Sequence, residues 1–224
     1  MIKLFVILLS LPKTVWFNLR CFPLHQALRL PVFVIYSCDI GKLKGKIILP
    51  RTIRIAMIRI GFHSVPALNS KDTTRISVEK GGVLEFEGSA HIGKGSKTYV
   101  CKNGRLLLGD NFAISASSTI LCYKHISFGS DIQFSWDCLV MDSDTHFIFG
   151  KDGEVVNVNK DIIFGNHIWI GCRCMILKGS IIPDDCVIGG GTIIMGGRNS
   201  YYKPMTIIAG TPSSSVKEIG GWHI

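Results

Sequence analysis

A short cluster of acidic residues and a histidine contains the residue types that could do chemistry. Asp142, Asp144 and His146 alternate with Ser143 and Thr145. An imidazole can accept and return a proton near neutral pH, since its unperturbed pKa is about 6.5, and a neighbouring carboxylate can fix its tautomer. The same three side chains could instead ligate a divalent metal ion, or lie in a loop as solvated turn formers. The cluster therefore indicates a proton-transfer site, with these two alternatives open.

The elements around this cluster repeat every six residues. An aliphatic or aromatic residue returns at every sixth position after it, and a residue able to face inward in a narrow space lies four positions later. A period of six fits neither a helix nor a half-buried strand, so it predicts short strands joined by tight turns, three to a coil of a parallel β-helix. The leading residues are Phe164, Ile170, Ile176, Ile182, Ile188 and Ile194, and the inward ones are Ile168, Cys174, Ser180, Cys186 and Thr192.

Residues 142–163 interrupt this repeat, which is legible from Phe86 onwards. The cluster opens the interruption, and Lys151-Asp152-Gly153 marks a turn at its tip. A loop of about twenty residues inside a regular stack is more often functional than accidental. We therefore expect His146 to leave the rigid stack at a defined point.

The hexads, the inserted loop and the Trp169-Ile170-Gly171 triplet resemble those of the hexapeptide-repeat acyltransferases. The nearest patterns are the galactoside and maltose O-acetyltransferases and those that modify capsule or lipopolysaccharide. The resemblance covers about residues 86–217. It implies an all-β, left-handed parallel β-helix and a homotrimer whose active sites lie between adjacent subunits.

The resemblance also implies roles for particular residues. His146 would act as the general base, which takes the proton of an acceptor hydroxyl while that oxygen attacks the thioester of acetyl-CoA, and Asp144 or Asp142 would orient the imidazole. Other implied positions are Trp169, Glu154 and Ser117 at the acyl or acceptor site, and Gly171, Gly189, Gly191, Thr192 and Lys217 at coenzyme A.

The sequence departs from the family pattern at several of these positions. Ser214 and the Met195-Gly196-Gly197 triplet do not match the family's phosphate-binding end, and serine replaces asparagine around Ser117. These departures weaken the implied phosphate clamp and leave the sugar specificity open.

Composition limits the other classes of protein to which the chain could belong. Hydrophobic residues make up 47% of the 224 residues and charged residues 18%, which leaves no room for a long disordered tail. The net charge of +9 comes from scattered basic residues without interleaved aromatic ones, so we expect no nucleic-acid partner. Cys138, Cys174 and Cys186 lie at small inward positions, which predicts reduced core thiols, a cytoplasmic protein and no metal site.

The first 28 residues predict a helix or a pair of helices. Its apolar residues, which we expect to be buried, are Leu4, Ile7, Leu8, Leu11, Val15, Leu19 and Phe22. The stripe could cap the open first coil, pack on a neighbouring subunit or rest on a membrane surface; capping is favoured, because a β-helix exposes unpaired strand edges at its ends. The predicted organisation is a helical or irregular cap (1–40), a β-helix domain (41–214, inserted loop 142–163) and a tail (215–224).

The sequence therefore predicts an acyl-CoA-dependent O-acyltransferase, with acetyl-CoA as co-substrate, acting on a sugar or polysaccharide precursor in the cytoplasm or at the inner membrane surface. Two rivals remain. One is an N-acetyltransferase acting on an amino-sugar. The other is a non-transferase β-helix trimer, either a scaffold or a metal enzyme similar to carbonic anhydrase that uses His125, His146 and His167.

Overall fold

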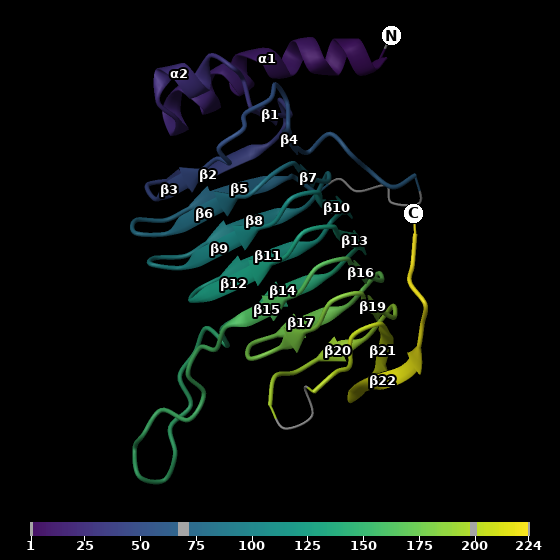
Figure 1. Cartoon of the computed structure of the whole chain (residues 1–224). Coiled ribbons are helices and arrows are strands. Elements are labelled where there is room, and N and C mark those ends of the chain that lie inside the picture. The colour runs from purple at the N-terminus through teal and green to yellow at the C-terminus, as the bar shows by residue number, and fades with distance from the viewer. Residues whose placement is uncertain (1, 67–71, 198–200, 224) are drawn as a thin grey trace.

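The chain folds into a three-sided stack of coils capped by two helices (Figure 1). The computed structural model describes residues 2–66, 72–197 and 201–223. Helices α1 (Ile2–Cys21) and α2 (Leu24–Ala27) come first, and strands of two to six residues follow. The helices end within the range 1–40 that the sequence assigns to a cap, and the first strand begins at Val32.

Each coil contributes one strand to each of three sheets. In the described part of the chain, sheet A comprises β1 (Val32–Val34), β4 (Ile58–Ile60), β7 (Ala90–Ile92), β10 (Phe112–Ala116), β13 (Ile132–Trp136), β16 (Ile168–Ile170), β19 (Val187–Ile188), β21 (Thr206–Gly210) and β22 (Ser213–Glu218). Neighbouring strands are parallel except β21 and β22, which are antiparallel.

The other two sheets follow the same order. Sheet B comprises β2 (Asp39–Leu43), β5 (Arg75–Val78), β8 (Lys97–Val100), β11 (Thr119–Cys122), β14 (Leu139–Met141), β17 (Met175–Leu177) and β20 (Ile193–Ile194). Sheet C comprises β3 (Lys46–Ile48), β6 (Val83–Phe86), β9 (Arg105–Leu108), β12 (His125–Phe128), β15 (Ile162–Phe164) and β18 (Ile181–Ile182). This topology confirms the predicted parallel β-helix.

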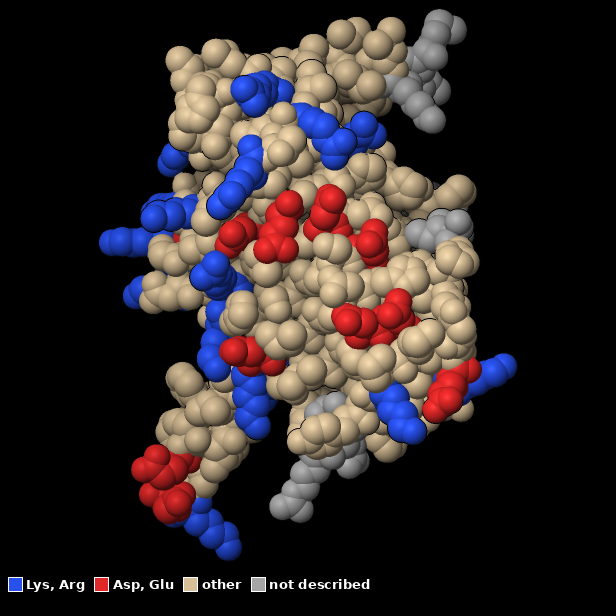
Figure 2. Space-filling view, in the orientation of Figure 1, with Lys and Arg blue, Asp and Glu red and all other residues tan. Residues whose placement is uncertain are grey.

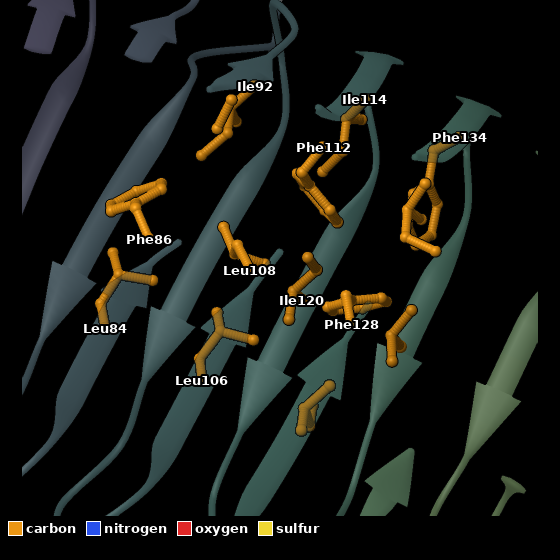
Figure 3. Packing of buried hydrophobic residues seen from close by; sticks show 14 of the residues in the cluster. Leu84, Phe86, Ile92, Leu106, Leu108, Phe112, Ile114, Ile120, Phe128 and Phe134 are labelled. Carbon is orange, nitrogen blue, oxygen red and sulfur yellow. The ribbon is translucent and has the colours of Figure 1, made fainter. Parts of the chain in front are cut away.

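The core is a set of inward-facing columns, one per sheet. All six leading residues of the predicted hexads are at most 3% exposed, and the five inward residues four positions later are also buried. Phenylalanine fills the middle of the stack, where the rings of Phe128 and Phe112 lie 5.1 Å apart between centroids (Figure 3). On its other side, the Phe128 ring stacks on Phe164 with centroids 4.5 Å apart. The period of six is therefore the period of burial.

Helix α1 caps the first coil with its polar side. Ser10, Thr14 and Asn18, four residues apart, are fully buried against β1 and the residues that follow it. The Asn18 amide donates to Val32 O (2.7 Å), and Val34 N donates to Thr14 Oγ1 (3.0 Å). These side chains supply hydrogen bonds that a preceding coil would otherwise make, so the edge strand has no unpaired row of backbone groups.

The favoured placement of the apolar stripe, against the first coil, is wrong for most of its members. Leu4 is 64% exposed, Leu8 55% and Leu19 51%, while Phe22 is buried. The physical reason is that β1 presents backbone polar groups to the helix, and only hydrogen-bonding side chains can satisfy them. The cap is real, but its apolar face points outward.

Candidate functional site

The inserted loop joins β14 to β15, at the corner between sheets B and C, and projects from the stack (Figure 1). Within it, Phe149 and Val155 form an antiparallel bridge, and Gly153 turns at φ +82°. A left-handed φ of this kind is readily adopted by glycine, which agrees with the predicted turn. The tip carries Lys151, Asp152 and Glu154, whose opposite charges are visible in Figure 2.

The base of the loop is held by buried and bridging polar groups. Asp142 is fully buried, and its two carboxylate oxygens accept the backbone N–H groups of Tyr123 (2.7 Å) and Lys124 (2.8 Å). Burial raises the pKa of Asp142, against the effect of these N–H groups. Where the loop returns, Lys124 Nζ lies 2.8 Å from Asp161 Oδ1. Both ends of the loop are thus tied to the corner that joins β11 to β12.

Asn157, on the returning half of the loop, and Lys178, from another coil, fix the part of the loop that carries His146. Asn157 Nδ2 donates to Asp144 Oδ2 (2.9 Å) and to His146 O (2.8 Å). Lys178 Nζ, from the coil below, bonds to Asp144 Oδ2 (2.5 Å) and to Asn157 O (2.7 Å). The hydrogen bond from the Lys178 ammonium holds the pKa of Asp144 below its ordinary value. Sequence reasoning missed Lys178 and Asn157, because nothing in the hexad pattern marks them.

The imidazole of His146 is exposed, and its Nδ1 lies 3.0 Å from Thr145 Oγ1. Among the described residues, no hydrogen bond joins the ring to Asp142 or Asp144, whose carboxylates are bonded to the groups named above. Nε2 is therefore the ring nitrogen available to a substrate. The support of the ring by either carboxylate stays a prediction.

A second set of functional groups lies on the outer face of sheet A. A groove of about 490 Å³ is bordered by Trp169, Gln133 and Ser135. Trp169 is 44% exposed, as its outward position in the hexad predicts, and its Nε1 donates to Ser135 Oγ (3.2 Å). An exposed indole beside hydroxyl and amide groups is suited to a ligand that is apolar on one face and polar at its edges.

The tail completes this groove with a residue that the sequence did not indicate. The Trp222 ring stacks on His167 with centroids 4.3 Å apart and planes 8° apart, and its Nε1 donates to His167 O (3.0 Å). His167 Nδ1 in turn lies 2.8 Å from Asp185 Oδ1. Trp222 stands 6.3 Å from Trp169, so the tail supplies a second aromatic wall. No repeat extends into the tail, which is why sequence reasoning missed it.

The glycine positions implied for coenzyme A meet at the corner between sheets A and B. A Cβ on Gly171 would lie 2.6 Å from Gly190 N, so glycine is required there for the coils to stack. A Cβ on Gly191, where φ is +74°, would meet no atom within 4 Å, so this corner is open to a ligand. Thr192 is buried, and its hydroxyl donates to Gly189 O (2.5 Å) within the turn.

The remaining implied residues are separate from one another. Glu154 is exposed at the loop tip, and Lys217 is exposed on β22. Ser117, with φ +47°, lies at the corner where β10 meets β11. His125 lies on β12 beside Asp161, while His167 lies under Trp222. The described residues thus do not bring together the three histidines of the metal rival within one chain.

Comparison with known proteins identifies acetyltransferases. No family model matches the sequence. The chain is 25% identical over 183 residues to the probable acetyltransferase Rv3034c of Mycobacterium tuberculosis, covering 78% of this chain and 54% of that protein. It is 27% identical over 148 residues to the galactoside O-acetyltransferase of Escherichia coli K12, covering 63% and 70%. The chain thus spans about half the length of the mycobacterial relative.

The fold has a solved counterpart. The crystal structure of the polySia-specific acetyltransferase NeuO superimposes with a TM-score of 0.56 at 23% identity, and the match covers 87% of this chain and 89% of NeuO. At this identity the likeness establishes the fold. Sequence relatives and fold together confirm that the chain resembles the hexapeptide-repeat acyltransferases and shares their left-handed β-helix.

Proposed function

We propose that this protein transfers an acetyl group from acetyl-CoA to a hydroxyl of a sugar or glycan precursor. The observation that carries the proposal is the exposed imidazole of His146 on a loop anchored at both ends to a β-helix whose relatives are O-acetyltransferases by name. A base must be fixed in place yet reachable, and this loop provides both.

His146 is the proposed general base. Nδ1 is engaged with Thr145, so Nε2 would take the proton of the acceptor hydroxyl. Acetyl-CoA supplies the acetyl group as a thioester: the acceptor oxygen bonds to the carbonyl carbon, the carbon–sulfur bond breaks, and the proton taken by His146 leaves with the thiol. The open corner at Gly191 is the proposed wall for the donor, with the phosphates towards Lys217.

We propose that the working unit is a homotrimer. His146 follows β14 at the corner between sheets B and C, whereas Trp169 lies on sheet A, on the other side of the coil (Figure 1). One chain therefore does not bring the base to the sheet A groove. Two adjacent chains can do so when the loop of one reaches the groove of the next. Light scattering would show three chains per particle, and a monomeric active enzyme would contradict this assembly.

We further propose that the capped end rests on an anionic membrane from the cytoplasmic side. The outer face of the two helices exposes Leu8, Leu19 and Leu28, and residues 2–21 include the one described helix that is long and apolar enough to span a bilayer. Its buried polar side is bonded to β1, which favours an in-plane helix over a spanning one.

Charge supports this placement. Residues 1–60 contain ten Lys or Arg and one Asp, a net charge of +9, and the other 164 residues balance to zero. Basic side chains are visible below the helices in Figure 2. Vesicle flotation tests the contact: we expect binding to phosphatidylglycerol vesicles, little binding to phosphatidylcholine, and loss of binding in Leu8→Asp/Leu19→Asp. The proposal would be contradicted if the variant bound phosphatidylglycerol vesicles as well as the wild-type protein does, or if the wild-type protein bound both kinds of vesicle equally.

Transfer itself is tested with purified protein, acetyl-CoA and a panel of neutral, amino and acidic sugars. We expect a thermal shift with acetyl-CoA and a product heavier by one acetyl group. Alkali should release the acetyl group, since an ester is labile to base and an amide is stable. An alkali-stable product would establish the N-acetyltransferase instead, and absence of acetyl-CoA binding would favour a scaffold.

A further inference from the structure

The sheet A groove continues beyond its aromatic end. A smaller hollow of about 130 Å³, bordered by Arg59 and Phe62, shares His63 and His91 with the larger one. The outward residues Arg59, His91, Ala113, Gln133 and Trp169 are strand partners in succession, so they form one straight column across five strands. Four strand spacings of about 4.8 Å place Arg59 about 19 Å from Trp169.

The far end of this column is cationic. Arg59 lies on β4, its direct partner His91 on β7, and His63 follows β4. Arg59 Nε donates to Ala56 O (3.2 Å), and none of the ion pairs among the described residues includes Arg59, His63 or His91. These three basic groups stand together on an exposed surface without a described acidic partner.

The surroundings of His91 carry no described compensating charge. Strand β4 supplies Arg59, the segment after β4 supplies His63, and β10 places the uncharged Ala113 opposite. Burial lowers the pKa of His91, and the positive charges of Arg59 and His63 lower it further. An anion bound here would reverse that effect, because it would offset the mutual repulsion of the three groups.

We propose that the β4 end of the groove binds an anionic group of the acceptor, a carboxylate or a phosphate, while the acetylated sugar lies against Trp169 and Trp222. This inference rests on the proposed function for its choice of a sugar. His91 and Arg59 lie three and four strand spacings from Trp169, about 14 Å and 19 Å, which exceeds one sugar ring. The acceptor is therefore an oligosaccharide that carries its carboxylate or phosphate on a residue other than the acetylated one. Aromatic rings receive the flat faces of sugar rings, and the cationic end receives the charge.

Direct binding, measured by calorimetry on the assembled protein without acetyl-CoA, tests the subsite independently of catalysis. The probes are trigalacturonate, a sialic acid trimer, UDP-galactose and neutral maltotriose. We expect at least one anionic probe to bind about tenfold or more tightly than maltotriose, and the carboxylate and pyrophosphate probes distinguish the two sources of charge. Binding should weaken as pH rises, because a bound anion attracts the charged imidazole of His91 and gains nothing from the neutral ring.

A variant and a matched control complete the test. Arg59→Gln/His91→Asn should lower the affinity for the preferred anionic probe by about tenfold or more and leave the affinity for maltotriose unchanged. Lys46→Gln removes a basic group from sheet C, on another face, and should change neither. The subsite is overturned if all probes bind alike, if none binds, or if the double variant behaves like the control. Retained acetyl transfer in that case would leave the proposed function standing, while loss of acetyl-CoA binding would count against the function alone.

Discussion

Removal of the Asn18 side chain should weaken the attachment of the helical cap to the first coil. The Asn18 amide donates to Val32 O (2.7 Å), and Val32 N donates to Asn18 Oδ1 (3.3 Å). Val32 is 1% exposed, so Asn18→Ala leaves two buried backbone groups without partners. Each such group costs about 1–3 kcal/mol, which gives a loss of about 2–6 kcal/mol in the free energy of unfolding.

The loss should be local, because each coil of a solenoid contacts only its neighbours. Hydrogen exchange followed by mass spectrometry should show faster exchange in α1, β1 and β4, and little change beyond β10. Leu19→Ser is the matched control: Leu19 is adjacent in sequence but 51% exposed, so stability should change by less than about 0.5 kcal/mol. If Leu19→Ser destabilised the cap more than Asn18→Ala, the helix would pack through its apolar face and the account of the cap would be refuted.

Three further predictions concern the loop and the donor wall. Asp142→Ala should lower the melting temperature by leaving two backbone N–H groups unpaired, while the folded variant keeps its rate of acetyl transfer; an unchanged melting temperature with a lowered rate would indicate a catalytic role instead. The Lys178–Asp144 pair stabilises the loop fully above the ordinary pKa of Asp144 and loses this effect as pH falls through the lowered pKa of the folded protein. Lys178→Met should therefore speed hydrogen exchange in the loop at pH 7, and the effect should shrink as pH falls through that lowered pKa. Equal exchange at pH 7 would contradict the pairing. Cys172 borders the open corner near Gly190, so coenzyme A should slow its alkylation; unchanged labelling would move the donor elsewhere.

Much of the fold could be predicted from sequence, because one physical constraint repeats. A narrow three-sided core admits one large inward residue per strand. Successive strands in sheets C, A and B are therefore marked by Phe164, Ile170 and Ile176, and Ile182 begins the next coil. The inserted loop and the outward Trp169 follow from the same phase. The early coils are less regular, and their strands were legible as β-rich segments without a register.

The features that escaped prediction depend on contacts between distant segments. The polar side of α1 is buried because β1 presents backbone groups that need hydrogen-bond partners. The spacing of apolar residues along a helix does not indicate that such groups lie opposite it. Likewise, Lys178 reaches Asp144 across 34 residues, and Trp222 reaches His167 across 55. Neither residue belongs to a motif, so only the folded chain places it at the site.

The role of His146 is the central claim, and the rate of acetyl transfer by His146→Ala tests it most directly. The assay uses the acceptor found in the sugar panel, with acetyl-CoA binding measured on the same preparation. The account predicts a fall in rate of about 10²–10⁴-fold, because a positioned general base contributes that much, and an unchanged dissociation constant for acetyl-CoA. A variant that kept the full rate with every accepted sugar would contradict the mechanism.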